Sequence, residues 1–352
     1  MDRKKLGTFS YGTLWQVESS NGPVKVMDIS SFSAAAYQHG SEADKEREAQ
    51  TLIDCMRRPL GFGAVRDADY IIDPKNLSDA YDFINLLFSL PEPVLRRFVT
   101  DDTSSGYSWL GREAYQPNTP EQWKRYWHVS PKTSATFWPS LQELAGRSKA
   151  DLDFYQHCTK TVIPTIHKQF GELGVFVLNV LAHHYYDLEE GHFTEKVPRR
   201  IGNNWLRLLE YIANPAAQGA EIIAGAHRDS SSLAVLDTSH DQSPIPSLEV
   251  LAKRIGWVAA NVPKGGYVIN IGLTLERYFA QLQKEGVANP NVDPLKRTLH
   301  RVVRHDPRLR RLSIVEFLGP QSDFRIGDET AGQILADDLS RYTQERTKER
   351  PK

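Results

Sequence analysis

The sequence predicts a mainly β protein with flanking helices, whose core is a double-stranded β-helix, or jelly roll. Three observations support this fold class. After residue 200 the hydrophobic period changes from 3.6 to 2, which indicates strands rather than helices. Gly, Pro and Asp divide that region into many short strands, as in a sandwich or a closed double sheet. A helical pattern over 139–185 precedes the strands and predicts a long supporting helix after a shorter one.

Helices and short strands are expected before residue 139. In order, the predicted elements are a strand at 24–29, a helix at 42–58, a strand at 61–65, and helices at 76–88 and 92–98. Pro59 ends the first helix, because proline cannot continue it. The glycines of the second strand indicate a close backbone approach. Residues 99–135 are polar and loop-like yet rich in aromatic side chains, so we expect this loop to pack over another part of the molecule.

Eight short strands are predicted after residue 200, followed by a C-terminal helix. The strands span 206–211, 221–226, 232–236, 247–251, 257–262, 266–271, 298–303 and 311–318, and the helix spans about 329–348. Because side chains alternate between the faces of a strand, residues two apart on any of these strands point to the same side.

The composition disfavours several classes of function. Lys and Arg total 43 against 44 Asp and Glu, and no polybasic block stands out, which disfavours nucleic acid as the main partner. The sequence contains no run of about 18 apolar residues, so we predict no membrane span. The charged N-terminus lacks the apolar segment of a secretory signal. Cys55 and Cys158 are expected to be reduced, buried thiols, so we predict a cytoplasmic protein.

Two histidines and one aspartate form the first candidate site. His227 and Asp229 are two residues apart beside a predicted strand, so their side chains should project together. His300 begins a distant predicted strand. Two histidines and a carboxylate are typical of a facial triad, which leaves open metal positions that suit Fe(II), O₂ and a bidentate co-substrate. Taken alone, the His-x-Asp triplet is more often a surface turn, because such triplets occur often by chance.

Arg311 and Ser313 form the second candidate site. They share one face of the last predicted core strand, which a turn at 305–307 would fold back beside the strand of His300. A guanidinium fork with a hydroxyl beside it is a good receptor for a carboxylate. Taken alone, this pair is more often a strand with a surface arginine.

The order of these motifs resembles the isopenicillin-N-synthase-like branch of the iron(II)/2-oxoglutarate-dependent dioxygenases. His-x-Asp is followed after about 70 residues by His-Arg-Val-Val, and after about 10 more by Arg-x-Ser. Other stretches between residues 23 and 319 are similar as well. They are 24–29 (the family's opening strand), 61–65 (its Gly-Phe-Phe strand), 106–113 with 122–124 (its Gly-Tyr and Lys-containing segment), 206–211 (its strand ending in Tyr-Pro) and 266–272 (the strand ahead of the distal histidine).

The resemblance implies a non-haem Fe(II) enzyme. His227, Asp229 and His300 would be the catalytic residues that hold the metal. Arg311 and Ser313 would bind the distal carboxylate of 2-oxoglutarate, whose keto-acid end would chelate the iron. Such an oxidoreductase uses O₂ to oxidise an unactivated C–H bond of a small metabolite by hydroxylation, desaturation or cyclisation. Its co-products are succinate and CO₂, and ascorbate is a candidate reductant.

A further strand lines the site near the co-substrate and substrate in this family, and here it carries Tyr211 and Arg207 on one face. The sequence departs from the family pattern on that strand, because Leu209 replaces an Asn, and we expect Arg207 to take over its polar contact. The interval before His300 is also longer than usual, so we expect 281–296 to be an extended loop at the mouth of the metal site that acts as a lid.

We predict one catalytic domain over residues 1–352. Its parts would be an N-terminal region of helices and strands at 1–135, supporting helices at 136–200, the jelly-roll core with the iron site at 201–320, and a C-terminal helix at 321–352. The expected partner is a small-molecule substrate, with plant hormones, flavonoids, amino acids and microbial secondary metabolites all open. We expect no nucleic-acid or membrane partner, and a monomer or a weak homo-oligomer.

Three other functions stay open. In a 2-oxoglutarate-independent oxidase or cyclase, such as isopenicillin N synthase, Arg311 and Ser313 would bind a substrate carboxylate instead. A non-enzymatic ligand-binding jelly roll would require a broken triad. A metal-assisted hydrolase would need neither O₂ nor 2-oxoglutarate. Decay of 2-oxoglutarate in the presence of Fe(II) and O₂ separates the predicted oxygenase from all three.

Overall fold

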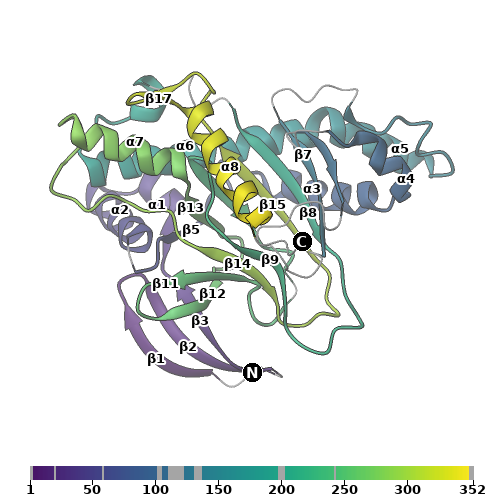
Figure 1. Cartoon of the computed structure of the whole chain (residues 1–352), viewed down its shortest axis with the longest axis horizontal. Coiled ribbons are helices and arrows are strands. Elements are labelled where there is room, and N and C mark those ends of the chain that lie inside the picture. The colour runs from purple at the N-terminus through teal and green to yellow at the C-terminus, as the bar shows by residue number, and fades with distance from the viewer. Residues whose placement is uncertain are drawn as a thin grey trace.

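Two large β-sheets face each other at the centre of the molecule, and helices cover the outer side of one of them (Figure 1). The computed structural model describes all residues except 1–2, 20, 58, 101–104, 110–122, 131–136, 197–202, 242 and 349–352. The paired sheets confirm the predicted jelly-roll core with flanking helices, whereas the assignment of the whole chain to one catalytic domain stays a prediction.

Within the described residues, seven strands form the first sheet and eight form the second. In spatial order the first sheet contains β1 (Arg3–Phe9), β2 (Gly12–Ser19), β3 (Gly22–Ile29), β12 (Gly256–Asn261), β11 (Leu248–Ala252), β14 (His300–Arg304) and β9 (Glu221–His227). The second contains β4 (Ser31–Ser33), β5 (Phe62–Arg66), β13 (Tyr267–Ile271), β10 (Leu233–Asp237), β15 (Arg311–Leu318), β8 (Trp205–Tyr211), β7 (Lys124–Val129) and β6 (Gly106–Ser108). A separate pair of short strands, β16 (Arg325–Ile326) and β17 (Glu329–Thr330), precedes the last helix.

The helices lie mainly against the eight-stranded sheet. They are α1 (Ala34–His39), α2 (Glu42–Met56), α3 (Pro74–Phe88), α4 (Glu92–Leu95), α5 (Lys149–His157), α6 (Ile163–Tyr186), α7 (Leu273–Lys284) and α8 (Ala331–Lys348). A π-helical turn, Cys158–Val162, joins α5 to α6. The buried face of α6 packs on β10 and β15, so the long helix predicted over 139–185 supports the strands of the candidate site.

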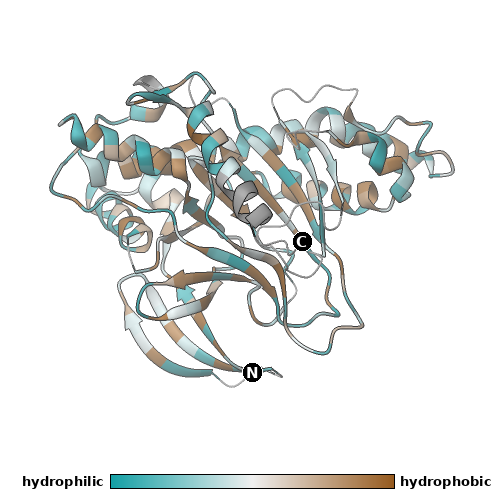
Figure 2. Cartoon of the chain, viewed as in Figure 1, coloured by the Kyte–Doolittle hydropathy of each residue, from teal (hydrophilic) through white to brown (hydrophobic). Residues whose placement is uncertain are grey.

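Apolar side chains form a continuous core between α6 and the eight-stranded sheet. Phe170, Leu173, Val177 and Leu181 of α6 are fully buried there and recur at three- and four-residue steps. In Figure 2 the central strands carry brown, apolar stretches, while the helices alternate between brown and teal. This core holds one wall of the candidate site rigidly from behind.

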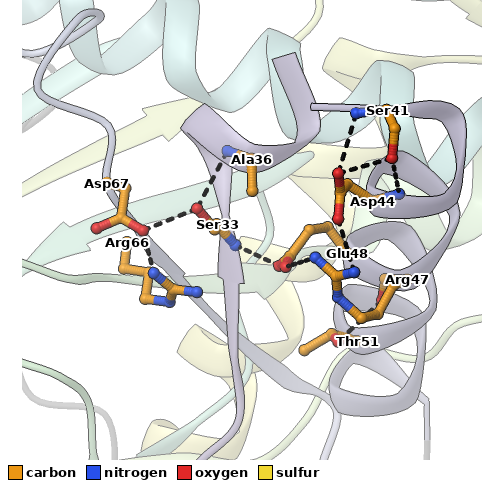
Figure 3. A network of polar contacts seen from close by, with 9 residues as sticks. All are labelled: Ser33, Ala36, Ser41, Asp44, Arg47, Glu48, Thr51, Arg66 and Asp67. Atoms are coloured by element: carbon orange, nitrogen blue, oxygen red, sulfur yellow. Dashed lines mark hydrogen bonds and ion pairs between the residues drawn. The ribbon is translucent and has the colours of Figure 1, made fainter. Parts of the chain in front are cut away.

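A buried carboxylate connects the N-terminal helices to the sheet (Figure 3). Glu48 of α2 accepts a hydrogen bond from the backbone N–H of Ser33 at 2.8 Å. The Ser33 hydroxyl in turn donates to Asp67 at 2.7 Å, just beyond β5. Ser41 and Asp44 form a capping box at the start of α2. These contacts fix β4 and β5 at the edge of the eight-stranded sheet.

The structure corrects three of the expectations. Residues 3–19 form β1 and β2, which extend the seven-stranded sheet, although no strand was expected there. The segment 99–135 is not one loop, because β6 and β7 within it pair beside β8. The lid interpretation of 281–296 is wrong. Tyr185 and Tyr186 at the end of α6 hold this segment by hydrogen bonds to the backbone of Asp293 and Leu295, and none of its residues lines the candidate site.

None of the helices in the described part of the chain is long and apolar enough to cross a membrane.

Candidate active site

The predicted triad comes together at the end of two neighbouring strands. His227 is the last residue of β9 and pairs with His300, the first residue of β14, across the antiparallel ladder. Asp229 lies two residues beyond the end of β9, rather than on the strand as expected. Its Oδ1 is 3.7 Å from the Nε2 atom of each histidine. One ligand atom from each of the three side chains thus lies within 4.8 Å of the others.

Backbone carbonyls fix the orientation of both imidazoles. The Nδ1 N–H of His227 donates to Gly225 O at 2.8 Å, and that of His300 donates to Thr298 O at 3.2 Å. Each ring therefore presents the lone pair of Nε2 to the space beside Asp229. Burial, and next the neighbouring His300, lower the pKa of His227 well below its ordinary value. A neutral imidazole is the form that coordinates a metal.

Asn270 orients the carboxylate of the triad. Asp229 is almost fully buried, and its Oδ2 accepts a hydrogen bond from Asn270 Nδ2 at 2.6 Å. Asn270 is a buried residue near the end of β13, a strand of the opposite sheet. This contact turns Oδ1 of Asp229 towards the two histidines, so the carboxylate presents one oxygen to the shared space.

Two glycines let neighbouring segments approach the triad closely. Gly61 has φ +70°, and a Cβ there would lie 2.1 Å from Thr298 Oγ1. This approach brings Phe62 edge-on to the ring of His300, with 5.4 Å between centroids. A Cβ on Gly272 would lie 2.0 Å from the carbonyl oxygen of Ser231. The sequence prediction of a close approach at 61–65 is therefore confirmed, and it serves to pack His300.

The residues of the triad fit a divalent iron. Two imidazole nitrogens and one carboxylate oxygen from one side form the donor set of the 2-His-1-carboxylate facial triad. Each donor is held by a partner of its own: a carbonyl for each histidine and an amide for the carboxylate. Such outer contacts orient metal ligands and raise their basicity.

Three parallel rows of side chains form the opposite wall, on adjacent strands β7, β8 and β15. The first row consists of Lys124, Tyr211 and Arg311, the second of Tyr126, Leu209 and Ser313, and the third of His128, Arg207 and Val315. Seven of these residues line a cavity with the triad: Arg311, Ser313, Val315, Tyr211, Arg207, Leu209 and Lys124. The space between atoms in the cavity and at its mouth, open solvent included, amounts to about 580 Å³. All seven predicted site residues thus face one space.

Arg311 is buried with part of its guanidinium lacking hydrogen-bond partners. Its side chain is 4% exposed and lies over the ring of Tyr211, with 5.0 Å from Cζ to the centroid. Nε is 3.4 Å from Asp241 Oδ2. Among the described residues, neither Nε nor Nη1 of Arg311 has a hydrogen-bond partner. A buried guanidinium in this state favours a bidentate anionic ligand, because leaving its N–H groups unsatisfied costs free energy.

Arg207 is oriented by its neighbours on the same wall. Its Nε donates to His128 Nε2 at 2.6 Å across the β7–β8 ladder. Its guanidinium also lies over the rings of Tyr126 and Phe317, 4.1 Å and 5.2 Å from their centroids. Arg207 therefore does not point into bulk solvent but lines the cavity as a fixed cation.

Three contributors to this site were missed in the sequence: Lys124, His128 and Asn270. Lys124 and His128 fall in the segment that was interpreted as a loop. The alternation that places both side chains on one face of a strand was therefore not considered. The strand pattern of 266–271 could have shown that Asn270 points to one face, but its partner Asp229 is distant in sequence. Of the aromatic residues in the 99–135 segment, Trp127 is buried in the main core, as packing of this segment predicts, and Tyr115 lies outside the described residues.

Known proteins share this fold and part of the sequence. No protein-family model matches the chain. Gibberellin 3-beta-dioxygenase 4 of Arabidopsis thaliana is 25% identical over 273 residues, which cover 76% of this chain and 71% of that protein. A 2OG-Fe(II) oxygenase family protein of Caulobacter crescentus superposes with a TM-score of 0.66 and 25% identity, covering 88% of this chain and 98% of that one. A Neurospora crassa protein in complex with alpha-KG gives a TM-score of 0.67 at 19% identity, over 90% and 96% of the two chains, and so supports the fold alone.

A jelly roll with this donor set defines a non-haem iron oxygenase, a class of oxidoreductase. The chain is similar in both sequence and fold to iron(II)/2-oxoglutarate-dependent dioxygenases, in agreement with its resemblance to the isopenicillin-N-synthase-like branch of that family. Enzymes of this family use Fe(II), 2-oxoglutarate and O₂.

Proposed function

We propose that this dioxygenase holds Fe(II) through His227, Asp229 and His300 and oxidises a C–H bond of a small metabolite. The observation that carries the assignment is the convergence of two oriented imidazoles and one oriented carboxylate within 4.8 Å. Iron bound there supplies the redox chemistry that couples oxidative decarboxylation of 2-oxoglutarate to substrate oxidation. The chain's own contribution is to fix the donor atoms before the metal arrives.

Arg311 and Ser313 bind the distal carboxylate of 2-oxoglutarate in this proposal. Both side chains are buried, they lie two residues apart on β15, and both line the cavity. Nη1 of Arg311 has no hydrogen-bond partner among the described residues, so an incoming carboxylate oxygen would satisfy a donor that is otherwise buried without one. The Ser313 hydroxyl offers a further donor on the same face.

Arg207 and Tyr211 orient the bound molecules near the metal. The ring of Tyr211 packs against one face of the Arg311 guanidinium. It therefore limits the directions from which a carboxylate can reach that guanidinium. Arg207 is held between two aromatic rings, so its charge is presented at a fixed place. We assign to Arg207 an anionic group, either the second carboxylate of 2-oxoglutarate or an acidic group of the substrate.

A small metabolite is the substrate class that the cavity and the relatives support. The cavity wall combines apolar residues of both sheets with a few charged groups, as small-molecule sites do. The Neurospora crassa protein has been crystallised with thymine, and a further structural neighbour with 2OG, Fe and JA. Hydroxylation, desaturation and cyclisation of such a substrate all remain within the proposal.

Succinate formation tests the proposed function. The purified chain is incubated with Fe(II), O₂, 2-oxoglutarate and pools of small metabolites, and succinate is measured. We expect release of succinate that rises with a matching metabolite. Oxidation of a metabolite without any loss of 2-oxoglutarate would replace the proposal by the oxidase alternative, in which Arg311 and Ser313 bind the substrate.

We further infer a cytoplasmic protein that acts as a monomer or a weak homo-oligomer, without a nucleic-acid or membrane partner. Cys55 and Cys158 are both buried, and neither is in a disulfide, which supports a reducing compartment. Burial raises the pKa of both thiols to about 12, so neither is a reactive thiolate.

A further inference from the structure

The C-terminal helix contributes a buried carboxylate beside the metal-binding segments. Asp338 of α8 is 6% exposed, although the preceding residue, Asp337, is exposed to solvent. Figure 1 shows α8 lying in front of the strands of the jelly roll, with its label beside that of β15. A carboxylate is rarely buried unless it is paired, so the partners of Asp338 indicate why it is there.

Those partners come from both segments that carry the triad. Arg297 donates to both oxygens of Asp338, at 2.9 and 3.2 Å, and lies three residues before His300. Ser230 donates to Asp338 Oδ2 at 2.6 Å and directly follows Asp229. One carboxylate of α8 therefore joins the turn after β9 to the chain that leads into β14.

These two segments need such a connection, because the sheet does not hold them. Asp229 lies outside the β9–β14 ladder, and residues 285–299 before His300 form no regular structure. The carbonyl of Asp229 accepts a hydrogen bond from Leu273 N at 3.0 Å and lies 3.5 Å from Arg297 Nη1. The backbone N–H of Arg297 donates to Glu276 of α7 at 2.9 Å. The polar contacts of Arg297 and Ser230 thus set how far Asp229 lies from His300.

We propose that Asp338 is a positioning residue for the metal centre: through Arg297 and Ser230 it holds Asp229 and His300 at the spacing that binds iron. The inference rests on the proposed role of the triad. A bidentate pair between a guanidinium and a carboxylate has directional geometry, so it resists changes in this spacing better than a single contact does. Docking of α8 then contributes to metal affinity, and removal of the carboxylate loosens the site without removing a ligand.

Metal titration of matched variants tests this role. Fe(II) is titrated anaerobically into the full-length apoprotein by calorimetry, for the wild type, Asp338→Asn and the control Asp337→Asn on the same helix. The thermal midpoint of each apoprotein is measured in parallel. We expect Asp338→Asn to weaken Fe(II) binding about 10-fold or more, as loss of outer-shell contacts does, and Asp337→Asn to bind as the wild type.

Substitutions at two further positions keep the test decisive if Asp338→Asn folds poorly. Ser230→Ala removes one hydroxyl donor and should weaken Fe(II) binding by a smaller factor. Arg297→Lys keeps the charge but loses the bidentate contact, and should fall between the wild type and Arg297→Ala. A lower thermal midpoint with unchanged Fe(II) affinity in Asp338→Asn and Ser230→Ala would overturn the inference, because it would show a purely structural contact.

The same titration separates failure of this inference from failure of the proposed function. If His227→Ala binds Fe(II) as tightly as the wild type, the assignment of the triad is wrong, and the positioning role falls with it. If His227→Ala loses binding while Asp338→Asn and Ser230→Ala keep it, only the role of Asp338 is overturned.

Discussion

The two walls of the cavity are built in different ways. On the wall formed by β9 and β14, each donor of the triad already has an outer partner: Gly225 for His227, Thr298 for His300 and Asn270 for Asp229. The wall formed by β7, β8 and β15 carries three basic side chains, those of Lys124, Arg207 and Arg311, and part of the buried Arg311 guanidinium lacks a hydrogen-bond partner in the described residues.

This difference separates two tasks. The first wall fixes the positions of lone pairs, which a metal requires before it binds. The second wall presents positive charge in a partly desolvated space, which an anionic co-substrate requires. Substitutions on the first wall should therefore remove metal binding, whereas those on the second should leave the metal in place and weaken the binding of organic anions.

The largest effect is expected from the triad itself. His227→Ala, Asp229→Ala and His300→Ala should each abolish stoichiometric Fe(II) binding and 2-oxoglutarate turnover, because two ligands no longer define the facial site. Circular dichroism should show an unchanged fold. His39→Ala, at an exposed histidine, is the control. If all three variants retained iron and turnover, the wall formed by β9 and β14 would not be the metal-binding wall.

Arg311→Ala should produce the next largest effect, on 2-oxoglutarate alone. Removal of the guanidinium leaves a carboxylate unpaired in a buried site, at a cost of roughly 2–5 kcal/mol, or about 30- to several-thousand-fold in affinity. Arg311→Lys should recover part of this loss, since an ammonium lacks the forked geometry. Ser313→Ala should cost about 10-fold or less.

Steady-state kinetics and direct Fe(II) titration distinguish the outcomes for Arg311. A rise in KM for 2-oxoglutarate with unchanged Fe(II) affinity supports the division between the walls. If the rise appears in KM for the substrate instead, the 2-oxoglutarate-independent oxidase becomes the better description of the enzyme.

Arg207→Ala should weaken the binding of one organic anion by a smaller factor. A hydrogen bond to a charged group contributes about 1.5–3 kcal/mol, so we expect a rise of roughly 10- to 100-fold in KM for either 2-oxoglutarate or the substrate. The KM that changes identifies the anion that Arg207 contacts. Unchanged values for both would assign Arg207 to packing between Tyr126 and Phe317.

The smallest effect is expected from Glu316, on the side of β15 that packs against α6, and it concerns only the free energy of unfolding. Glu316 of β15 is fully buried and accepts a hydrogen bond from His167 of α6 at 2.8 Å. Burial raises the pKa of Glu316 from 4.5 to about 7. The folded state therefore binds this proton more tightly than the unfolded state does, and the resulting stability is lost as pH rises from about 4.5 to about 7.

Glu316→Gln should remove that loss. We expect the free energy of unfolding of the wild type to fall relative to the variant over this pH range, with a slope of at most about 1.4 kcal/mol per pH unit. Chemical denaturation between pH 4 and 8 measures the slope, and Glu172→Gln on the exposed side of α6 is the control. Parallel curves for wild type and Glu316→Gln would contradict the assigned pKa.

Local patterns predicted most of the elements in this chain. The strand candidates after residue 200 correspond to β8 through β15, because alternation and turn residues are visible within each short segment. The strands β6 and β7 were missed, since polar residues and prolines around them are typical of loops, and only pairing with β8 stabilises them as strands. The lid at 281–296 was wrong for a related reason: hydrogen bonds to Tyr185 and Tyr186, far away in sequence, decide where this segment lies.

The residues of the candidate site also divide into those that a local pattern predicts and those that only tertiary packing brings to the site. The sequence could predict five of the site residues. Two pairs, His227 with Asp229 and Arg311 with Ser313, have a spacing of two residues, and the order of motifs identifies His300. Asn270, Lys124 and Asp338 reach the site from other elements, and no local spacing relates them to the triad. Their contributions depend on the packing of β13, β7 and α8, which the sequence does not display.

An anomalous difference map at the iron edge tests the central claim most directly. Crystals are grown anaerobically with Fe(II) and 2-oxoglutarate. We expect one strong peak bonded to Nε2 of His227, Oδ1 of Asp229 and Nε2 of His300, with 2-oxoglutarate extending from the metal to the guanidinium of Arg311. A peak held by other residues, or 2-oxoglutarate bound away from Arg311, would contradict the account.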